Sequence, residues 1–201
     1  MTDRFVVTIG RQYGSGGKII GEKLAKALGV PFYDKELLTE AARKSGICQE
    51  MFESNDEKPT SSLLYSLVMG TYSGDSLPLN HKLFLAQFDA IRSLADKGSC
   101  VIIGRCADYA LEDYKNVINV FIHAKMEDRI DRAVAQYGID INKAEDIIIK
   151  TDKKRASYYN FYSSKKWGHV DNYDITVDSS VLGIDDTVKL LKEFVELKMK
   201  K

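Results

Sequence analysis

The chain has 201 residues, of which 44% are hydrophobic and 29% are charged, and its 29 basic and 29 acidic side chains give a formal net charge of zero. This balance argues against a nucleic-acid partner held by bulk charge, and the recurring apolar runs argue against a disordered chain. Three scattered cysteines and three separated histidines favour neither a disulfide framework nor a zinc site. The sequence has no long apolar run and no signal-peptide core, which predicts a cytoplasmic protein with no membrane partner.

Short β-branched runs alternate with amphipathic stretches along the whole chain. The predicted strands are 5–9, 30–34, 100–103, 117–122 and 175–178, and the predicted helices are about 19–28, 35–44, 80–97, 126–137, a long charged helix within 138–164, and 185–198. A further helix is compatible with residues 61–69. This alternation predicts a doubly wound α/β domain with a five-stranded parallel sheet, whose strand order the periodicity does not determine.

A glycine-rich turn, Gly14-Ser15-Gly16-Gly17-Lys18, lies between the first predicted strand and the first predicted helix. Ligands of open parallel sheets bind at the carboxyl ends of the strands, where such a turn lets backbone N–H groups surround an anion beside a helix N-terminus. Lys18 would then reach the outer phosphates. We therefore predict a phosphate-binding loop; the alternative is a turn that only permits tight packing of the strand against the helix.

The turn departs from the full phosphate-loop pattern G-x-x-x-x-G-K-[ST]. Gln12 stands at the place of the first glycine, and Ile19 stands at the place of the hydroxyl that binds magnesium. Ser15 is a partial substitute for that hydroxyl. The third predicted strand ends in Gly104, where a Walker B aspartate would stand, so the sequence leaves the metal ligands unassigned.

The run from Ile9 to Gly21, IGRQYGSGGKIIG, resembles the opening of the cytidylate-kinase-like family, bacterial relatives of cytidylate kinase among the P-loop nucleoside monophosphate kinases. Further segments agree with that family in order and spacing, and together they span essentially the whole chain. These segments are 32–38 (FYDKELL), 101–107 (VIIGRCA), 129–132 (RIDR), 152–159 (DKKRASYY), 166–168 (KWG) and 172–174 (NYD).

The resemblance implies a single P-loop kinase domain over residues 1–201, with the strand order 2-3-1-4-5. It also implies a helical acceptor-binding insertion at about 44–80 and a helical lid at about 138–166. The implied activity is phosphoryl transfer from ATP, with Mg²⁺, to a CMP-like acceptor. The implied partners are small-molecule nucleotides, and neither the residues nor the resemblance indicates an oligomeric state.

Three candidate substrate-binding residues lie at the predicted carboxyl edge of the sheet. Arg105 follows the third strand, where an arginine can hold a phosphate through two parallel hydrogen bonds, and the resemblance assigns it to the acceptor; the alternative is a surface pair with Asp108. Arg11 flanks the glycine-rich turn and has a similar predicted role. Asp34 is predicted to bind an acceptor hydroxyl, to contact magnesium through water, or to orient the attacking oxygen, unless it only caps the helix that follows.

Phosphoryl transfer spreads negative charge over the transferring group, so its catalysis depends on well-placed cations. The resemblance implies that Arg132 and Arg155 reach the phosphates or the donor base, and with Lys18 they are the candidate catalytic residues. For Arg129 and Lys154 we expect instead a solvated helix face with local salt bridges.

Two other functions remain open from the sequence. One is a kinase for another small phosphorylated or hydroxylated metabolite, because residues 44–80 carry no signature that connects them with cytosine. The other is a nucleotide-binding sensor without turnover, because the Walker A pattern is incomplete and the Walker B carboxylate is missing. A sensor would bind ATP but would show no acceptor-dependent release of ADP.

Overall fold

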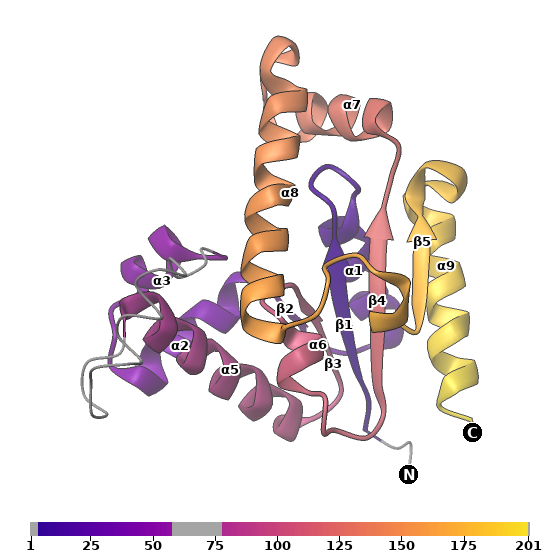
Figure 1. Cartoon of the computed structure of the whole chain (residues 1–201). Helices are drawn as coiled ribbons and strands as arrows, with labels where there is room; N and C mark the ends of the chain where they lie inside the picture. The colour runs from indigo at the N-terminus through magenta and orange to yellow at the C-terminus, as the bar shows by residue number, and fades with distance from the viewer. Residues whose placement is uncertain (1–3, 58–77, 201) are drawn as a thin grey trace.

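The predicted strands form one sheet in which every neighbouring pair is parallel (Figure 1). The structure is a computed structural model that describes residues 4–57 and 78–200. Its strands are β1 (Val6–Arg11), β2 (Phe32–Tyr33), β3 (Cys100–Ile103), β4 (Val117–His123) and β5 (Ile175–Asp178). Their order in the sheet is β2-β3-β1-β4-β5, which confirms the order implied by the family resemblance.

The helices lie close to the predicted ranges. They are α1 (Gly17–Leu28), α2 (Lys35–Ser45), α3 (Gln49–Asn55), α5 (Leu79–Lys97), α6 (Ala107–Ala110), α7 (Met126–Tyr137), α8 (Ile141–Ser163) and α9 (Ser179–Lys198), with a 3-10 turn at Val170–Asn172. Helix α9 begins earlier than predicted because a non-helical residue, Gly183, joins a short helical turn to the main helix. Helices α3 and α6 were not predicted, and the helix considered for residues 61–69 lies outside the described residues.

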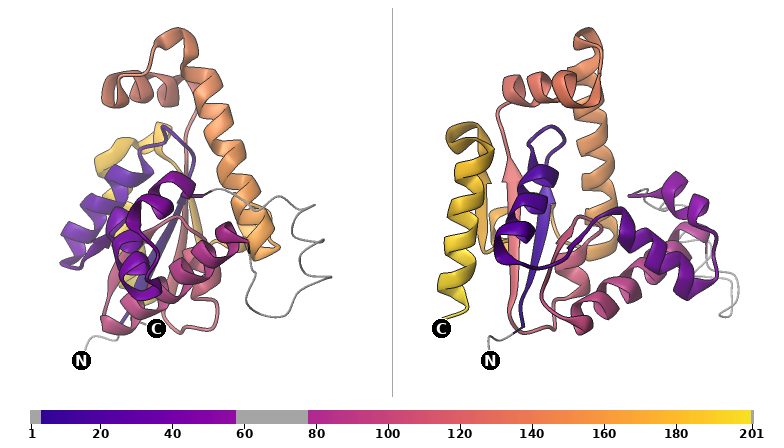
Figure 2. Two further views of the ribbon diagram at one scale, coloured as in Figure 1. Left: turned by 90° about the vertical axis from the view of Figure 1, so that its left-hand side faces the viewer. Right: turned by 180° about the vertical axis from the view of Figure 1, so that it is seen from behind.

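Successive side chains of β1 point to opposite faces of the sheet, and each face has its own layer of the hydrophobic core. Val7 and Ile9 pack with side chains of α1 and α9 on one face of the sheet. Val6 packs with side chains of α2 and α5 on the other face. Figure 2 shows the two helical layers with the sheet between them. Because parallel strands are buried on both faces, the strands appear in the sequence as nearly continuous apolar runs.

Helices α7 and α8 extend beyond the carboxyl ends of β1 and β4 (Figure 1). The C-terminal part of α8 is anchored by an aromatic cluster in which Tyr158, Tyr159 and Tyr162 are buried. The ring of Tyr162 stacks on that of Phe84 from α5, with centroids 3.9 Å apart. This anchoring holds α8 beside the sheet edge at which β1 ends. Within residues 4–57 and 78–200, no helix is long and apolar enough to cross a membrane.

Candidate active site

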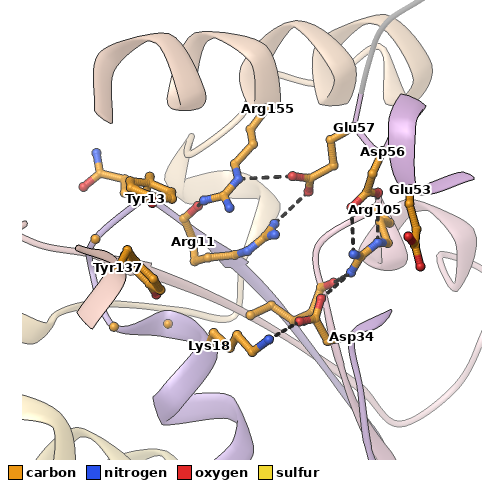
Figure 3. A pocket seen from close by; sticks show the side chains of 15 residues that line it. Arg11, Tyr13, Lys18, Asp34, Glu53, Asp56, Glu57, Arg105, Tyr137 and Arg155 are labelled. Atoms are coloured by element: carbon orange, nitrogen blue, oxygen red, sulfur yellow. Dashed lines mark hydrogen bonds and ion pairs between the residues drawn. The ribbon is translucent and has the colours of Figure 1, made fainter. Parts of the chain in front are cut away.

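A cavity of about 350 Å³ lies at the carboxyl end of β1, next to the glycine-rich loop and α8 (Figure 3). Its lining residues come from separate parts of the chain: Arg11, Gln12, Tyr13, Gly14, Gly16, Gly17, Lys18, Asp34, Glu53, Asp56, Glu57, Ile103, Arg105, Tyr137 and Arg155. All the site residues predicted from the sequence are in this set except Ser15 and Arg132. Ser15 is buried within the loop, and Arg132 donates a hydrogen bond to the main-chain oxygen of Gly14.

The glycine-rich loop needs glycine for steric reasons. At Gly14 the backbone φ is 75°, and a Cβ atom there would lie 2.6 Å from the main-chain oxygen of Arg129. The loop leads directly into α1, whose N-terminus has no side-chain cap among the described residues. Uncapped N–H groups of a helix N-terminus favour an anion, so phosphate binding at this loop stays the prediction.

The departures from the phosphate-loop pattern have structural roles. The Gln12 side chain accepts a hydrogen bond from the Ala124 N–H at 3.2 Å and so ties the loop to the end of β4. The Ser15 hydroxyl is buried and donates to the main-chain oxygen of Gln12 at 2.8 Å. Ser15 therefore uses its hydroxyl within the loop in this conformation, and it does not line the cavity.

Asp34 joins two cations at the cavity wall. Its Oδ2 atom lies 2.6 Å from Lys18 Nζ, and its Oδ1 atom lies 2.8 Å from a guanidinium nitrogen of Arg105. Burial alone would raise the pKa of Asp34, but the charge of Arg105 and the hydrogen bonds from both cations lower it, so the carboxylate stays ionised. Although Asp34 precedes α2, its side chain makes no capping hydrogen bond. The hydrogen bond to Asp34 is also the main reason that the pKa of Lys18 is raised.

Arg105 is held in the cavity by a strained turn. Gly104, Arg105 and Cys106 have φ angles of 71°, 53° and 54°, a left-handed run that is unfavourable for the two residues with side chains. The Arg105 side chain is only 4% exposed and pairs with Asp56 through two nitrogens, at 3.1 and 2.9 Å. The predicted alternative, a surface pair with Asp108, is not observed.

Glu57 lies between two arginines at the centre of the cavity. Its Oε1 atom is 2.8 Å from Arg11, and its Oε2 atom is 3.1 Å from Arg155. Burial would raise the pKa of Glu57, but the charges of Arg11, Arg155 and Arg105 outweigh it and hold the pKa far below the usual value. The Arg11 guanidinium also fills the space that a side chain on Gly104 would need. Together with the φ of 71° at Gly104, this contact disfavours a side chain at the place of a Walker B carboxylate.

Arg129 and Arg132 lie one turn apart on α7, and both donate to main-chain oxygens of the loop. Arg132 donates to Gly14, and Arg129 donates to Tyr13 at 2.8 Å. Arg129 has the salt bridge to Asp152 that the sequence suggested, but it is buried, so the expectation of a solvated face is wrong for this residue. Lys154 is exposed as expected.

Several cavity residues were missed by reasoning from the sequence. Asp56 and Glu57 belong to a polar stretch that is typical of a loop, and only the folded chain brings them to the arginines. Tyr13 and Tyr137 lie together on one side of the cavity with ring centroids 5.4 Å apart, and the guanidinium carbon of Arg155 lies 5.6 Å from the centre of the Tyr13 ring (Figure 3). No pattern at either tyrosine indicated this pairing.

Comparison with known proteins gives consistent results. The sequence model of the Cytidylate kinase-like family matches residues 6–181. The cytidylate kinase of Methanopyrus kandleri is 23% identical over 200 residues, which cover 95% of this chain and 93% of that protein.

Solved structures show the same fold. An uncharacterized protein from Eubacterium ventriosum superimposes with a TM-score of 0.74 and 29% identity, over 96% of this chain and 99% of that one. The shikimate kinase of Bacteroides thetaiotaomicron gives a TM-score of 0.56 at 18% identity, also over 96% and 99% of the two chains. At that identity the likeness concerns the fold alone.

Proposed function

Because the chain belongs to the cytidylate kinase-like family and shares the fold of a P-loop kinase, we propose that it transfers the γ-phosphoryl group of Mg-ATP to a CMP-like nucleoside monophosphate. One observation carries the proposal. Four cations from separate segments, Arg11, Lys18, Arg105 and Arg155, converge on one cavity beside the glycine-rich loop. A kinase that consumes ATP in this way would act in the cytoplasm.

The donor phosphates are proposed to bind at the glycine-rich loop, Gly14 to Lys18. Backbone N–H groups and the N-terminus of α1 supply partial positive charge there, and Lys18 adds a full charge on a side chain that is 48% exposed. Because this side chain is about half exposed, Lys18 is proposed to exchange Asp34 for a phosphate oxygen.

The acceptor is proposed to bind on the opposite side of the cavity. Arg105 has the planar, bidentate geometry that suits an acceptor phosphate, as its pairing with Asp56 demonstrates. The ionised carboxylate of Asp34 lies between Arg105 and Lys18, where it can hold an acceptor hydroxyl or orient the attacking oxygen. Arg11, at the end of β1, is proposed to assist in binding the acceptor.

The transferring group would lie between these two ends, within reach of Arg155. Arg155 enters the cavity from α8, and together with Lys18 and Arg132 it is proposed to stabilise the charge that develops on the phosphoryl oxygens. Arg132 donates to the main-chain oxygen of Gly14 and does not line the cavity, so this role requires Arg132 to exchange that oxygen for a phosphate. The protein thus performs the reaction by positioning and charge rather than by a covalent step.

Magnesium is proposed to arrive as part of the Mg-ATP substrate. In the part of the chain that the structure describes, no three His, Cys, Asp or Glu side chains are placed to hold a metal ion. Mg²⁺ commonly keeps several waters and binds through substrate phosphates with one or two carboxylates, so a resident metal cage is not required. Bound magnesium would neutralise phosphate charge.

The direct test is ADP release from Mg-ATP with a panel of nucleoside monophosphates that includes CMP and dCMP. We expect release that depends on the acceptor and is fastest with a cytidine nucleotide. Turnover with a different nucleotide or with a small hydroxylated metabolite would support the proposed kinase activity and would contradict the proposed CMP-like acceptor. ATP binding with no turnover for any acceptor would favour the sensor and contradict the proposed activity.

A further inference from the structure

A closed cycle of hydrogen bonds holds the residue that precedes the glycine-rich turn. The main-chain N–H of Tyr13 donates to Asp152 Oδ1 at 2.7 Å, and the main-chain oxygen of Tyr13 accepts from Arg129 Nε at 2.8 Å. Arg129 and Asp152 in turn form an ion pair with each other, and both side chains are largely buried. One ion pair between α7 and α8 therefore satisfies both polar main-chain groups of Tyr13.

This cycle fixes the direction of a loop N–H group. In a planar trans peptide the N–H points opposite to the preceding C=O. Because Arg129 binds the Tyr13 oxygen, the N–H of Gly14 is directed away from Arg129. Gly14 itself lines the cavity, and a Cβ atom on it would lie 2.6 Å from the main-chain oxygen of Arg129, so the loop passes close to the main chain of α7 at this residue.

The same helix supplies a cavity residue. Asp152 and Arg155 are three residues apart on α8, so they lie on neighbouring parts of one helix face. Arg155 extends into the cavity and donates to the main-chain oxygen of Arg11 at 3.3 Å, while Asp152 holds Tyr13. The position of α8 therefore affects both the loop and the arginine that faces it.

We propose that Asp152 is a positioning residue that holds the loop in its ATP-binding conformation through Tyr13 and Arg129, and so couples the lid helix to donor binding. This inference rests on the proposed role of the loop as the donor-phosphate site. A purely structural ion pair would lower thermal stability and would not act on one substrate more than on the other. A loss of donor binding that is larger than the loss of acceptor binding therefore distinguishes a positioning role from a purely structural one.

The test compares three variants with the wild type. Asp152→Ala removes both contacts, Asp152→Asn keeps an acceptor for the Tyr13 N–H but loses the ion pair, and Asp146→Ala changes an exposed carboxylate on the same helix. Titration calorimetry with a non-hydrolysable ATP analogue and Mg²⁺ gives the donor Kd without turnover. Steady-state kinetics then give KM for ATP and for the acceptor separately.

We expect Asp152→Ala to raise the Kd of the analogue about tenfold, because the hydrogen bond to the Tyr13 N–H is lost together with the ion pair that orients Arg129. Asp152→Asn should give a smaller increase, Asp146→Ala should have no effect, and KM for the acceptor should stay within about twofold for all three. If Asp152→Ala does not fold, Asp152→Asn provides the test: its Kd for the analogue should rise while its KM for the acceptor stays within about twofold.

Two results would overturn the inference alone. Both require that the wild type binds the analogue. The first is a donor Kd that is unchanged in the folded Asp152 variants. The second is a weakening of donor binding and acceptor binding by the same factor. A wild-type protein that does not bind the analogue would overturn the proposed donor site and this inference together. The wild-type titration therefore separates the failure of the two proposals.

Discussion

Glu57 forms an ion pair with Arg155, and this contact joins the segment that follows α3 to the helix α8 (Figure 3). The second carboxylate oxygen of Glu57 pairs with Arg11, so one negative charge lies where two guanidinium groups converge. A phosphate group would satisfy the same two arginines with similar geometry. If phosphate-bearing ligands bind at this cavity as proposed, they compete with Glu57 for Arg11 and Arg155.

The first prediction concerns this competition. Glu57→Gln removes the negative charge and keeps the size of the side chain, so both arginines become more available to phosphate. We expect the Kd of CMP or of a non-hydrolysable ATP analogue, measured by calorimetry, to fall about three- to tenfold. Glu53→Gln is the matched control, since Glu53 lines the same cavity but hydrogen-bonds to Gln49. Weaker binding in Glu57→Gln would show that this carboxylate helps to hold the ligand.

The second prediction is a pH dependence of stability. The folded pKa of Glu57 is held below its unfolded value, which is about 4.3 for a glutamate. Glu57 therefore contributes stability above that pH and loses the contribution as the pH falls toward its folded pKa. Urea unfolding between pH 7 and about pH 3 should show a steeper loss of stability in the wild type than in Glu57→Gln. Parallel curves for the two proteins would contradict the assigned ion pairs.

The third prediction concerns Lys18. Lys18→Met removes the proposed contact to the outer donor phosphates and should lower kcat about a hundredfold or more, while circular dichroism shows an unchanged fold. Lys23→Met is the control, because Lys23 lies on the same helix and pairs with the exposed Asp185. Full activity in Lys18→Met would remove this residue from the site.

The fourth prediction separates the two substrates. Arg105→Lys keeps the positive charge but cannot make the bidentate contact, so KM for the acceptor should rise about tenfold and KM for ATP should stay within about twofold. Arg92→Lys provides the comparison, since Arg92 pairs with Asp113 outside the cavity. A rise in KM for ATP alone would place Arg105 at the donor end.

The fifth prediction tests the packing at Gly104. Gly104→Ala places a Cβ atom against the Arg11 guanidinium at a residue with φ of 71°. Gly46→Ala has nearly the same backbone strain, with φ of 70°, but nothing lies within 4 Å of the added atom. Urea unfolding should show that Gly104→Ala is the more destabilising by about 1–3 kcal/mol. Equal losses would mean that Arg11 moves aside at no cost.

Much of the fold could be predicted because its signals are local. Each buried strand is a short apolar run, and the helices α5 and α7 begin and end within a residue or two of their predicted limits. The strand order came from the resemblance to a family, since periodicity carries no information on neighbours in a sheet. The place of Lys18, Asp34 and Arg105 in the cavity wall could be predicted because each follows or flanks the carboxyl end of a strand, and their roles stay predictions.

What the sequence by itself determined is the parallel α/β sheet, the position of the glycine-rich loop and the basic residues around it. The tertiary structure alone decided their partners: Glu57 between Arg11 and Arg155, and Asp152 on the main chain of Tyr13. The physical reason is distance along the chain. Helix and strand patterns repeat over a few residues, whereas the ion pair between Glu57 and Arg155 exists only after packing brings the turn that follows α3 and the helix α8 to one cavity.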